Sequence, residues 1–177
     1  KPQNTRSYEL GADISFFNNL VSINYTYSRQ NVKDQIFEVP LASSTGSSSF
    51  MTNGGKIHTN AHELTVNINP IRLKNVDWNI GINWSKIDNY VDELAPGVES
   101  IFLGGFTTPQ VRAGIGDKFP VIYGVSYARD DNGNLIVDED GVPMAGKDDV
   151  IGKVSPDFIL GFNTNLRLWK FNISAVF

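Results

Sequence analysis

Residues 5–27, TRSYELGADISFFNNLVSINYTY, decide the fold, because they contain two strands of alternating character joined by almost nothing. Apolar and polar side chains alternate along both, the period that places them on opposite faces of a sheet. Asn18 and Asn19 tolerate the left-handed backbone conformation of a tight hairpin turn. The stretch therefore predicts a β-hairpin whose apolar face carries Tyr8, Leu10, Ala12, Ile14 and Phe16, followed by Val21, Ile23, Tyr25 and Tyr27.

The length of this hairpin and the placement of its aromatic residues bear on its surroundings. Tyr8 and Phe16 lie eight positions apart on one face. That separation is about 27 Å along a strand, or about 21 Å along a membrane normal at a tilt of about 40°. The apolar band of a membrane barrel is about 25 Å tall. The hairpin alone fits both a membrane barrel and a half-buried soluble sheet.

Composition narrows the functional classes. The 177 residues contain no cysteine, which excludes thiolate metal sites, and the net charge of -4 argues against a nucleic-acid partner. No run of about 18 apolar residues occurs, so a transmembrane helix is not expected. The chain lacks an initiator Met and stops in mid-pattern at Phe177. We expect residues 1–177 to be a partial domain of a longer protein.

The same alternation returns in four later segments, residues 57–70, 76–85, 158–166 and 171–177. It is cleanest in VDWNIGINWS, where Trp78 and Trp84 share the apolar face. These two residues are about 20 Å apart along the strand, or about 15 Å along the normal. They cannot mark opposite borders of the apolar band, so one of them must lie within it.

The connections between these strands alternate in length. They are short at Asn18 and Asn19, long over residues 34–55, short over 71–75, very long over 92–155 and short over 167–170. We expect 34–55 to be a mobile loop, and 92–155 to contain a hairpin of strands 120–129 and 134–137. Long unstructured loops are uncommon in compact soluble domains, whereas bacterial outer-membrane barrels alternate short periplasmic turns with long extracellular loops.

The predicted fold class is therefore all-β, an antiparallel up-and-down transmembrane β-barrel segment of about six spanning strands paired in sequence order. The short turns, with Asn18, Arg72 and Trp169, would lie on the periplasmic side. We expect two faces, which include Ile14, Ile80, Ile82 and Leu160 toward lipid and Asp13, Asn79, Asn83 and Asn163 toward the lumen.

Several phrases occur together in one order along the chain. They are KPQNTRSYELGADISFFNNLVSINYTY, DQIFEVP, NGGKIHTNAHELTVNINPI, DWNIGINWSKIDNYVDEL, KFPVIYGVSYARD and DDVIGKVSPDFILGFNTNL. In this order they resemble the SusC-like (RagA-type) family of TonB-dependent outer-membrane transporters. The resemblance covers nearly the whole chain and is weakest between Ala95 and Val111. Ala61 and His62 depart from it, because the family tends to have Gly and an apolar residue there.

The resemblance implies a piece from the second half of a barrel of roughly 22 strands. It implies import of oligosaccharides or peptides, a SusD-like lipoprotein over the extracellular mouth, and a TonB complex that acts through a plug domain. The plug and a signal peptide are not expected within 1–177. The expected location is the outer membrane of a Gram-negative, Bacteroidetes-like cell, in contact with lipid.

Candidate contacts for substrate or partner are Arg112, Tyr123 and Tyr127, because their aromatic and cationic groups lie in the longest extracellular segment. Aromatic faces stack on sugars and contact peptides, but ordinary loop packing explains the same residues. The family offers no short binding motif to assign here. The substrate stays open, because selectivity would depend largely on parts outside this chain.

Two patterns invite a metal interpretation. His58 and His62 are about 13 Å apart on a strand, beyond shared coordination. Asp130, Asn132 and Asn134 have the opening spacing of a calcium loop, but Leu135 and Gly141 replace its essential Gly and Glu. We expect ordinary strand and turn residues, with no cofactor, metal or catalytic site.

The alternative from another class is a soluble, secreted all-β binding or adhesin module. Such a module would bury its apolar faces against a second sheet, whereas a barrel presents them to lipid.

Overall fold

The computed structural model describes residues 2–41, 43–47 and 49–177, and these are almost entirely β-strand. A single 3-10 turn, Ser43–Thr45, interrupts the strands among the described residues. The strands are β1 (Asn4–Phe16), β2 (Val21–Pro40), β3 (Ser49–Arg72), β4 (Val76–Glu93), β5 (Ser100–Gly105), β6 (Gln110–Gly114), β7 (Val121–Tyr127), β8 (Ala145–Lys153), β9 (Ile159–Leu168) and β10 (Phe171–Val176). Among the residues that the structure describes, no helix has the length and apolar character needed to cross a membrane.

The chain divides into two compact units. We call one the spanning unit, which comprises Arg6–Gln30, Thr59–Asp88 and Pro156–Phe177. The other, the loop unit, comprises Lys1–Thr5, Asn31–His58 and Asn89–Ser155. β2, β3 and β4 each contribute residues to both units.

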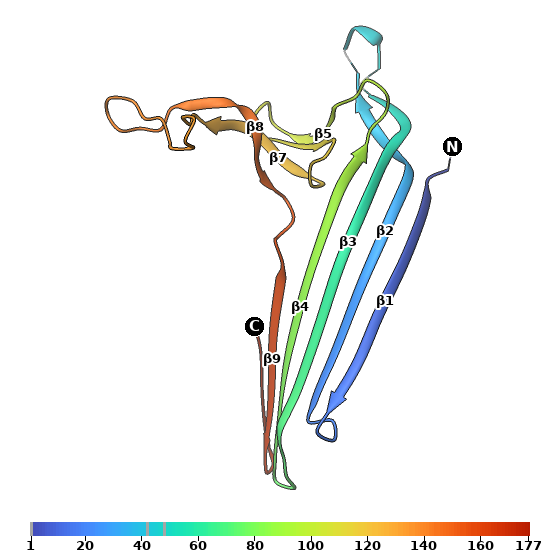
Figure 1. Ribbon diagram of the computed structural model, residues 1–177, viewed down its shortest axis with the longest axis vertical. Helices are drawn as coiled ribbons and strands as arrows, with labels where there is room; N and C mark the ends of the chain where they lie inside the picture. Colours follow the sequence, from blue (N-terminus) through green and yellow to red (C-terminus); the bar gives the residue numbers. More distant parts are fainter. Residues whose placement is uncertain (1, 42, 48) are drawn as a thin grey trace. The chain divides into compact units, whose positions relative to one another are not determined.

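Six strands form one antiparallel sheet in the order β1-β2-β3-β4-β9-β10, and β1 to β4 and β9 are visible as neighbouring ribbons in Figure 1. β9 follows β4 because β5 to β8 pair among themselves in a separate sheet. The register is continuous from Val76↔Leu168 to Ser85↔Ile159, and again from Phe171↔Leu168 to Val176↔Asn163. The prediction of six strands in sequential up-and-down order is confirmed.

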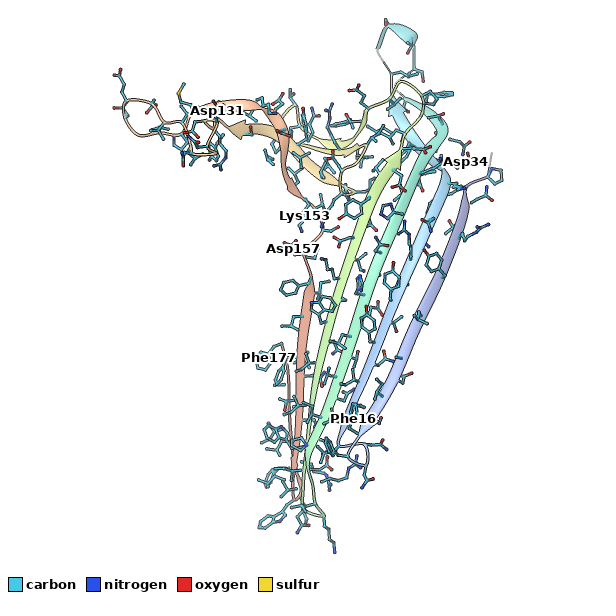
Figure 2. The ribbon with its side chains drawn as sticks, viewed as in Figure 1. Phe16, Asp34, Asp131, Lys153, Asp157 and Phe177 are labelled. Carbon is cyan, nitrogen blue, oxygen red and sulfur yellow. The ribbon has the colours of Figure 1, made fainter. Side chains whose placement is uncertain are left out.

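The short turns have the backbone conformations that their residues predict. Phe17, Asn18 and Asn19 have φ of 53°, 54° and 63°, so the left-handed conformation expected for the asparagines extends to the phenylalanine. Figure 2 places Phe16 at this turn. Trp169 takes φ of 54° in the turn between β9 and β10. Each of these turns reverses the chain within a few residues, with no longer loop between the strands.

Side chains in the spanning unit separate into two faces. We call outward the face with Ile14, Ile80, Ile82 and Leu160, and inward the face with Asp13, Asn79, Asn83 and Asn163. On the outward face, Trp78 Nε1 donates to Thr164 Oγ1 at 2.9 Å. On the inward face, Thr65 Oγ1 donates to Asn83 Oδ1 at 3.1 Å, and Asn24 donates to Asp13. The bond to Thr164 satisfies the indole N–H of Trp78 within the sheet.

The outward face stays uncovered in this unit. Every residue of β1 is exposed, and none of the buried apolar side chains of the described residues lies in the spanning unit. Phe177 lies against Phe162, with ring centres 6.0 Å apart (Figure 2). The apolar pattern therefore produces a face, not a core.

The loop unit, in contrast, has a core. β5, β6, β7 and β8 form a four-stranded antiparallel sheet. Phe37, Ile57 and Val91, from the ends of β2, β3 and β4, are buried together with Leu94, Ile101 and Ala113. Phe119 packs on this cluster, with its ring centre 6.4 Å from that of Phe37.

The prediction of a mobile loop over 34–55 is wrong, because β2 continues to Pro40 and β3 begins at Ser49. Gly55 reflects close packing, because a Cβ at this position would overlap the ring of Phe37. Asp34 has φ of 55° inside β2, a left-handed backbone conformation that is uncommon for residues other than glycine. Asn53 Nδ2 donates to the Asp34 carbonyl oxygen at 3.0 Å. Positions 42 and 48 of this segment lie outside the described residues.

The predicted hairpin of 120–129 with 134–137 is also wrong. β7 pairs with β8, from Val121↔Lys153 to Tyr127↔Ala145. Residues 134–137 do not form a strand. They make the isolated bridges Arg129↔Leu135 and Val137↔Pro143, with backbone bonds from the Asp130 N–H to the Asn134 oxygen and from the Ile136 N–H to the Ala128 oxygen. Gly133 and Gly141 take positive φ in the turns that these bridges close, so this segment is a pair of successive turns.

Candidate substrate-contact site

Two of the three predicted contact residues lie together in the loop unit. Antiparallel pairing of β6 and β7 sets Arg112 opposite Val121 and Gln110 opposite Tyr123. The Arg112 guanidinium carbon consequently lies 4.7 Å from the centre of the Tyr123 ring. A cation over an aromatic face at this distance is attracted by the ring quadrupole.

The surroundings of this pair hold both side chains in place. Ala113 follows Arg112 in β6, and Val121 lies opposite Arg112 in β7. These two residues are 0% and 3% exposed. Tyr123 Oη donates to the carbonyl oxygen of Asp148 at 3.3 Å. The Arg112 Nε is buried and has no hydrogen-bond partner among the described residues. The arrangement is a fixed guanidinium on a fixed ring, which suits an anionic or hydroxyl-rich ligand.

Tyr127 is not part of this pair. It lies four positions further along β7, and a register shift separates it from Val125. Its side chain is 63% exposed and lines a groove of about 870 Å³ between the ends of β7 and β8. Arg129, Lys147 and Asp149 line the same groove.

Charge in this groove is partly compensated. Lys147 Nζ lies 3.4 Å from Asp149 Oδ2. The backbone N–H of Val150 donates to Asp149 Oδ1 at 2.8 Å, and this bond, together with Lys147, lowers the pKa of Asp149 below its usual value. Asp149 is therefore ionised at neutral pH, and Arg129 adds a second cation to the groove.

The segment that invited a calcium interpretation is a turn. The Asp130 carboxylate accepts bonds from the N–H groups of Asn132 and Asn134 at 2.9 and 2.8 Å, and from Asn134 Nδ2 at 3.1 Å. The bonds from Asn134 are the main reason that the pKa of Asp130 is lowered. Gly133 takes φ of 84° to close the turn. The carboxylate is thus used by its own turn.

Each histidine has its own partners. His58 Nδ1 lies 2.7 Å from Asp92 Oδ1, and its ring stacks on Tyr90 at 5.2 Å. His62 Nδ1 lies 2.8 Å from the Tyr25 hydroxyl. In the part of the chain that the structure describes, no three His, Cys, Asp or Glu residues are placed to hold a metal ion.

Comparison with known proteins agrees with this fold. No family model matches the chain. TonB-dependent receptor P3 of Formosa agariphila is 26% identical over 202 residues, an alignment that covers 100% of this chain and 20% of the receptor. TonB-dependent receptor P26 of the same organism is 27% identical, over 99% of this chain and 20% of the receptor. The chain is a homologue of the TonB-dependent receptors.

Solved structures of RagAB are similar in fold to this TonB-dependent receptor homologue. The RagAB peptide transporter superposes with a TM-score of 0.80 at 18% identity, over 98% of this chain and 20% of that chain. The RagAB peptide importer in its closed-closed state gives 0.78 at 17% identity, over 98% and 20%. The predicted antiparallel barrel segment is thus confirmed, and the chain spans about a fifth of the length of these relatives.

Sequence reasoning missed several residues of this receptor homologue. Lys147 and Asp149, which line the groove beside Tyr127, were not predicted, because β8 was not recognised as the partner of β7. The signal available in the sequence is the apolar pair Val150 and Ile151, which follows Asp148 and Asp149.

Proposed function

We propose that the chain is part of an outer-membrane, TonB-dependent importer of oligosaccharides or peptides, energised through a plug that belongs to the rest of the transporter. Its SusD-like surface lipoprotein would act at the extracellular mouth and contact residues 92–155, and the short turns would face the periplasm. The observation that carries this proposal is the similarity to TonB-dependent receptors along the whole chain. The role proposed for this chain is structural and selective, not catalytic.

The exposed outward face supports a membrane location. A soluble secreted module would bury its apolar strand positions against a second sheet. In the spanning unit, large apolar side chains such as Leu10, Ile173 and Leu160 are instead 75%, 59% and 60% exposed. Lipid is the environment in which such a face costs nothing to leave uncovered by protein.

We test the partner by deleting Asp130 to Gly141 from the complete transporter. The deletion removes two self-contained turns and leaves β7 and β8 in place, so the barrel should still assemble. We expect lower yield of the co-purified lipoprotein, or slower growth on the cognate nutrient. Unchanged complex yield together with unchanged growth would contradict a role for this segment in the extracellular mouth.

We test the substrate contact with Arg112→Ala and Tyr123→Ala. Peptides are the first nutrient to supply, because the RagAB neighbour is a peptide transporter, and oligosaccharides are the second. Each substitution should lower uptake at limiting substrate, because it removes one half of the cation–ring pair. Lys170→Ala, at a short turn, is the matched control. Equal uptake by all variants would assign Arg112 and Tyr123 to loop packing.

A further inference from the structure

The two faces of the spanning unit carry opposite charge. Among the described strand residues of this unit, the outward positions carry four bases, Arg6, Arg29, Arg72 and Lys86, and one acid, Asp88. The inward positions carry four acids, Glu9, Asp13, Glu63 and Asp77, and one base, Arg167. A basic outward face is unexpected in a chain whose net charge is -4.

The outward bases gather at one end of the apolar stretch. Arg6, Arg29 and Lys86 lie beyond the apolar positions at the end away from the short turns, and Arg72 lies at the turn end. Tyr8 and Arg29 line one groove of about 310 Å³. Cationic side chains at the limit of an apolar band place their stems on it and their charges in the polar layer.

His62 lies within this basic end and is held by two tyrosines. Its Nδ1 lies 2.8 Å from the Tyr25 hydroxyl, and its ring centre lies 5.0 Å from that of Tyr27. Tyr27 Oη in turn donates to Asn60 Oδ1 at 3.2 Å. When Tyr25 donates to Nδ1, the neutral imidazole carries its proton on Nε2, which is then a donor. The ring is therefore fixed, and one donor is left for a ligand.

The register brings the three cationic or donor groups together. Thr65 bonds to Asn83 across β3 and β4. In the antiparallel pairing that sets these two residues opposite each other, three residues back along β3 and three forward along β4 lead to His62 and Lys86. These two are therefore also opposite each other, about 5 Å apart at Cβ. Arg29 follows Tyr27 on its face by two residues, about 7 Å along β2. Asp88 Oδ2 lies 3.5 Å from Lys86 Nζ, so one carboxylate lies beside these cationic groups.

We propose that Arg29, His62 and Lys86 bind the phosphate of an anionic lipid headgroup at the outward surface of the sheet. The inference rests on the proposed membrane location. The guanidinium and ammonium groups supply charge-assisted hydrogen bonds to phosphate oxygens, and the His62 Nε2 proton supplies a neutral one. Tyr8, Tyr25 and Tyr27 border the site with rings that suit the boundary between headgroup and acyl chain.

The test uses the complete transporter in vesicles of phosphatidylcholine with a minor fraction of phosphatidic acid. Phosphatidic acid retained on the protein after mild extraction is counted by native mass spectrometry. We expect Arg29→Gln, His62→Leu and Lys86→Gln each to lower retention, and the two charge removals to lower it about tenfold or more. Arg72→Gln, which removes the outward base at the turn end, should retain the wild-type level. Excess inorganic phosphate should not displace the lipid.

Three results would overturn the site. The first is that the Arg29 and Lys86 variants retain as much phosphatidic acid as the wild type. The second is that Arg72→Gln loses as much of it as those two variants. The third is that inorganic phosphate displaces the lipid. Insertion is followed separately by protection from protease. A wild-type protein that does not insert into phosphatidylcholine vesicles would refute the proposed membrane location itself. Inserted wild type without lipid retention would refute only the headgroup site.

Discussion

The loop unit and the spanning unit use apolar residues in opposite ways. In the loop unit, Phe37, Val91 and Ile101 are 6%, 0% and 2% exposed and pack on one another. In the spanning unit, Ile14 and Phe162 remain 48% and 37% exposed on an uncovered face. Both arise from similar alternating strands, but the loop unit covers its apolar side chains with protein, whereas in the proposed membrane location lipid would cover those of the spanning unit.

The largest expected effect comes from truncating the loop-unit core. Ile101→Ala should lower the free energy of unfolding by about 2 to 5 kcal/mol, because it leaves a cavity among packed neighbours. Ile80→Ala is the matched change on the outward face and should cost about 1 kcal/mol or less, because lipid chains fill the space. Denaturant titration of the complete protein in vesicles measures both, and equal losses would break the comparison between the units.

A charge placed on each face of the spanning unit gives the next largest effect. Ile80→Arg should cost about 2 to 4 kcal/mol near the membrane midplane, whereas Asn79→Arg should cost little because its side chain enters the polar interior. The same folding titration distinguishes them. The reverse order would mean that the outward and inward faces have been exchanged.

The bond between Trp78 and Thr164 predicts a smaller loss. Thr164→Val leaves the indole N–H without a partner, which should cost about 1 to 3 kcal/mol in an apolar environment. Trp78→Phe removes the donor, so adding Thr164→Val to it should cost much less. A double-mutant cycle with no coupling would show that this bond does not stabilise the sheet.

The smallest effect concerns the turn at Asp130 and its pH dependence. The pKa of Asp130 is lowered from 3.8 in the folded state, so the turn gains from ionisation above that pH and loses the gain as pH falls through the lower folded value. Hydrogen exchange, corrected for intrinsic rates, should show the amides of Asn132 and Asn134 less protected at pH 3 than at pH 6. Asp130→Asn keeps an acceptor that does not titrate, and a similar pH response in that variant would exclude this mechanism.

The strands and turns of the spanning unit could be predicted from the sequence, because alternation and turn chemistry depend on residues that are close together in the chain. Asn18, Asn19 and the alternation from Val76 to Trp84 each predict what the structure has. The loop unit was not predictable in the same way, because its pairing depends on contacts distant in sequence. Gly54 and Gly55 suggested a mobile loop, yet they are small because Ala95 and Phe37 lie against them.

The same difference applies to the candidate site. Arg112 and Tyr123 were named as residues of one long segment, and the β6 and β7 register brings them to 4.7 Å. Tyr127 shared the segment and the residue type, but a register shift placed it in another groove. Composition identifies residues suited to a ligand, whereas register decides which of them act together.

The left-handed backbone at Asp34 limits which changes β2 can accept at that position. Asp34 takes φ of 55° three residues before Phe37, which is 6% exposed. Asp34→Gly would keep both chain length and backbone conformation, because glycine adopts a positive φ without a steric penalty. Deleting residue 34 would instead move Phe37 by one position, and in a strand a shift of one residue turns the side chain to the opposite face. Position 34 therefore accepts a glycine more readily than a deletion.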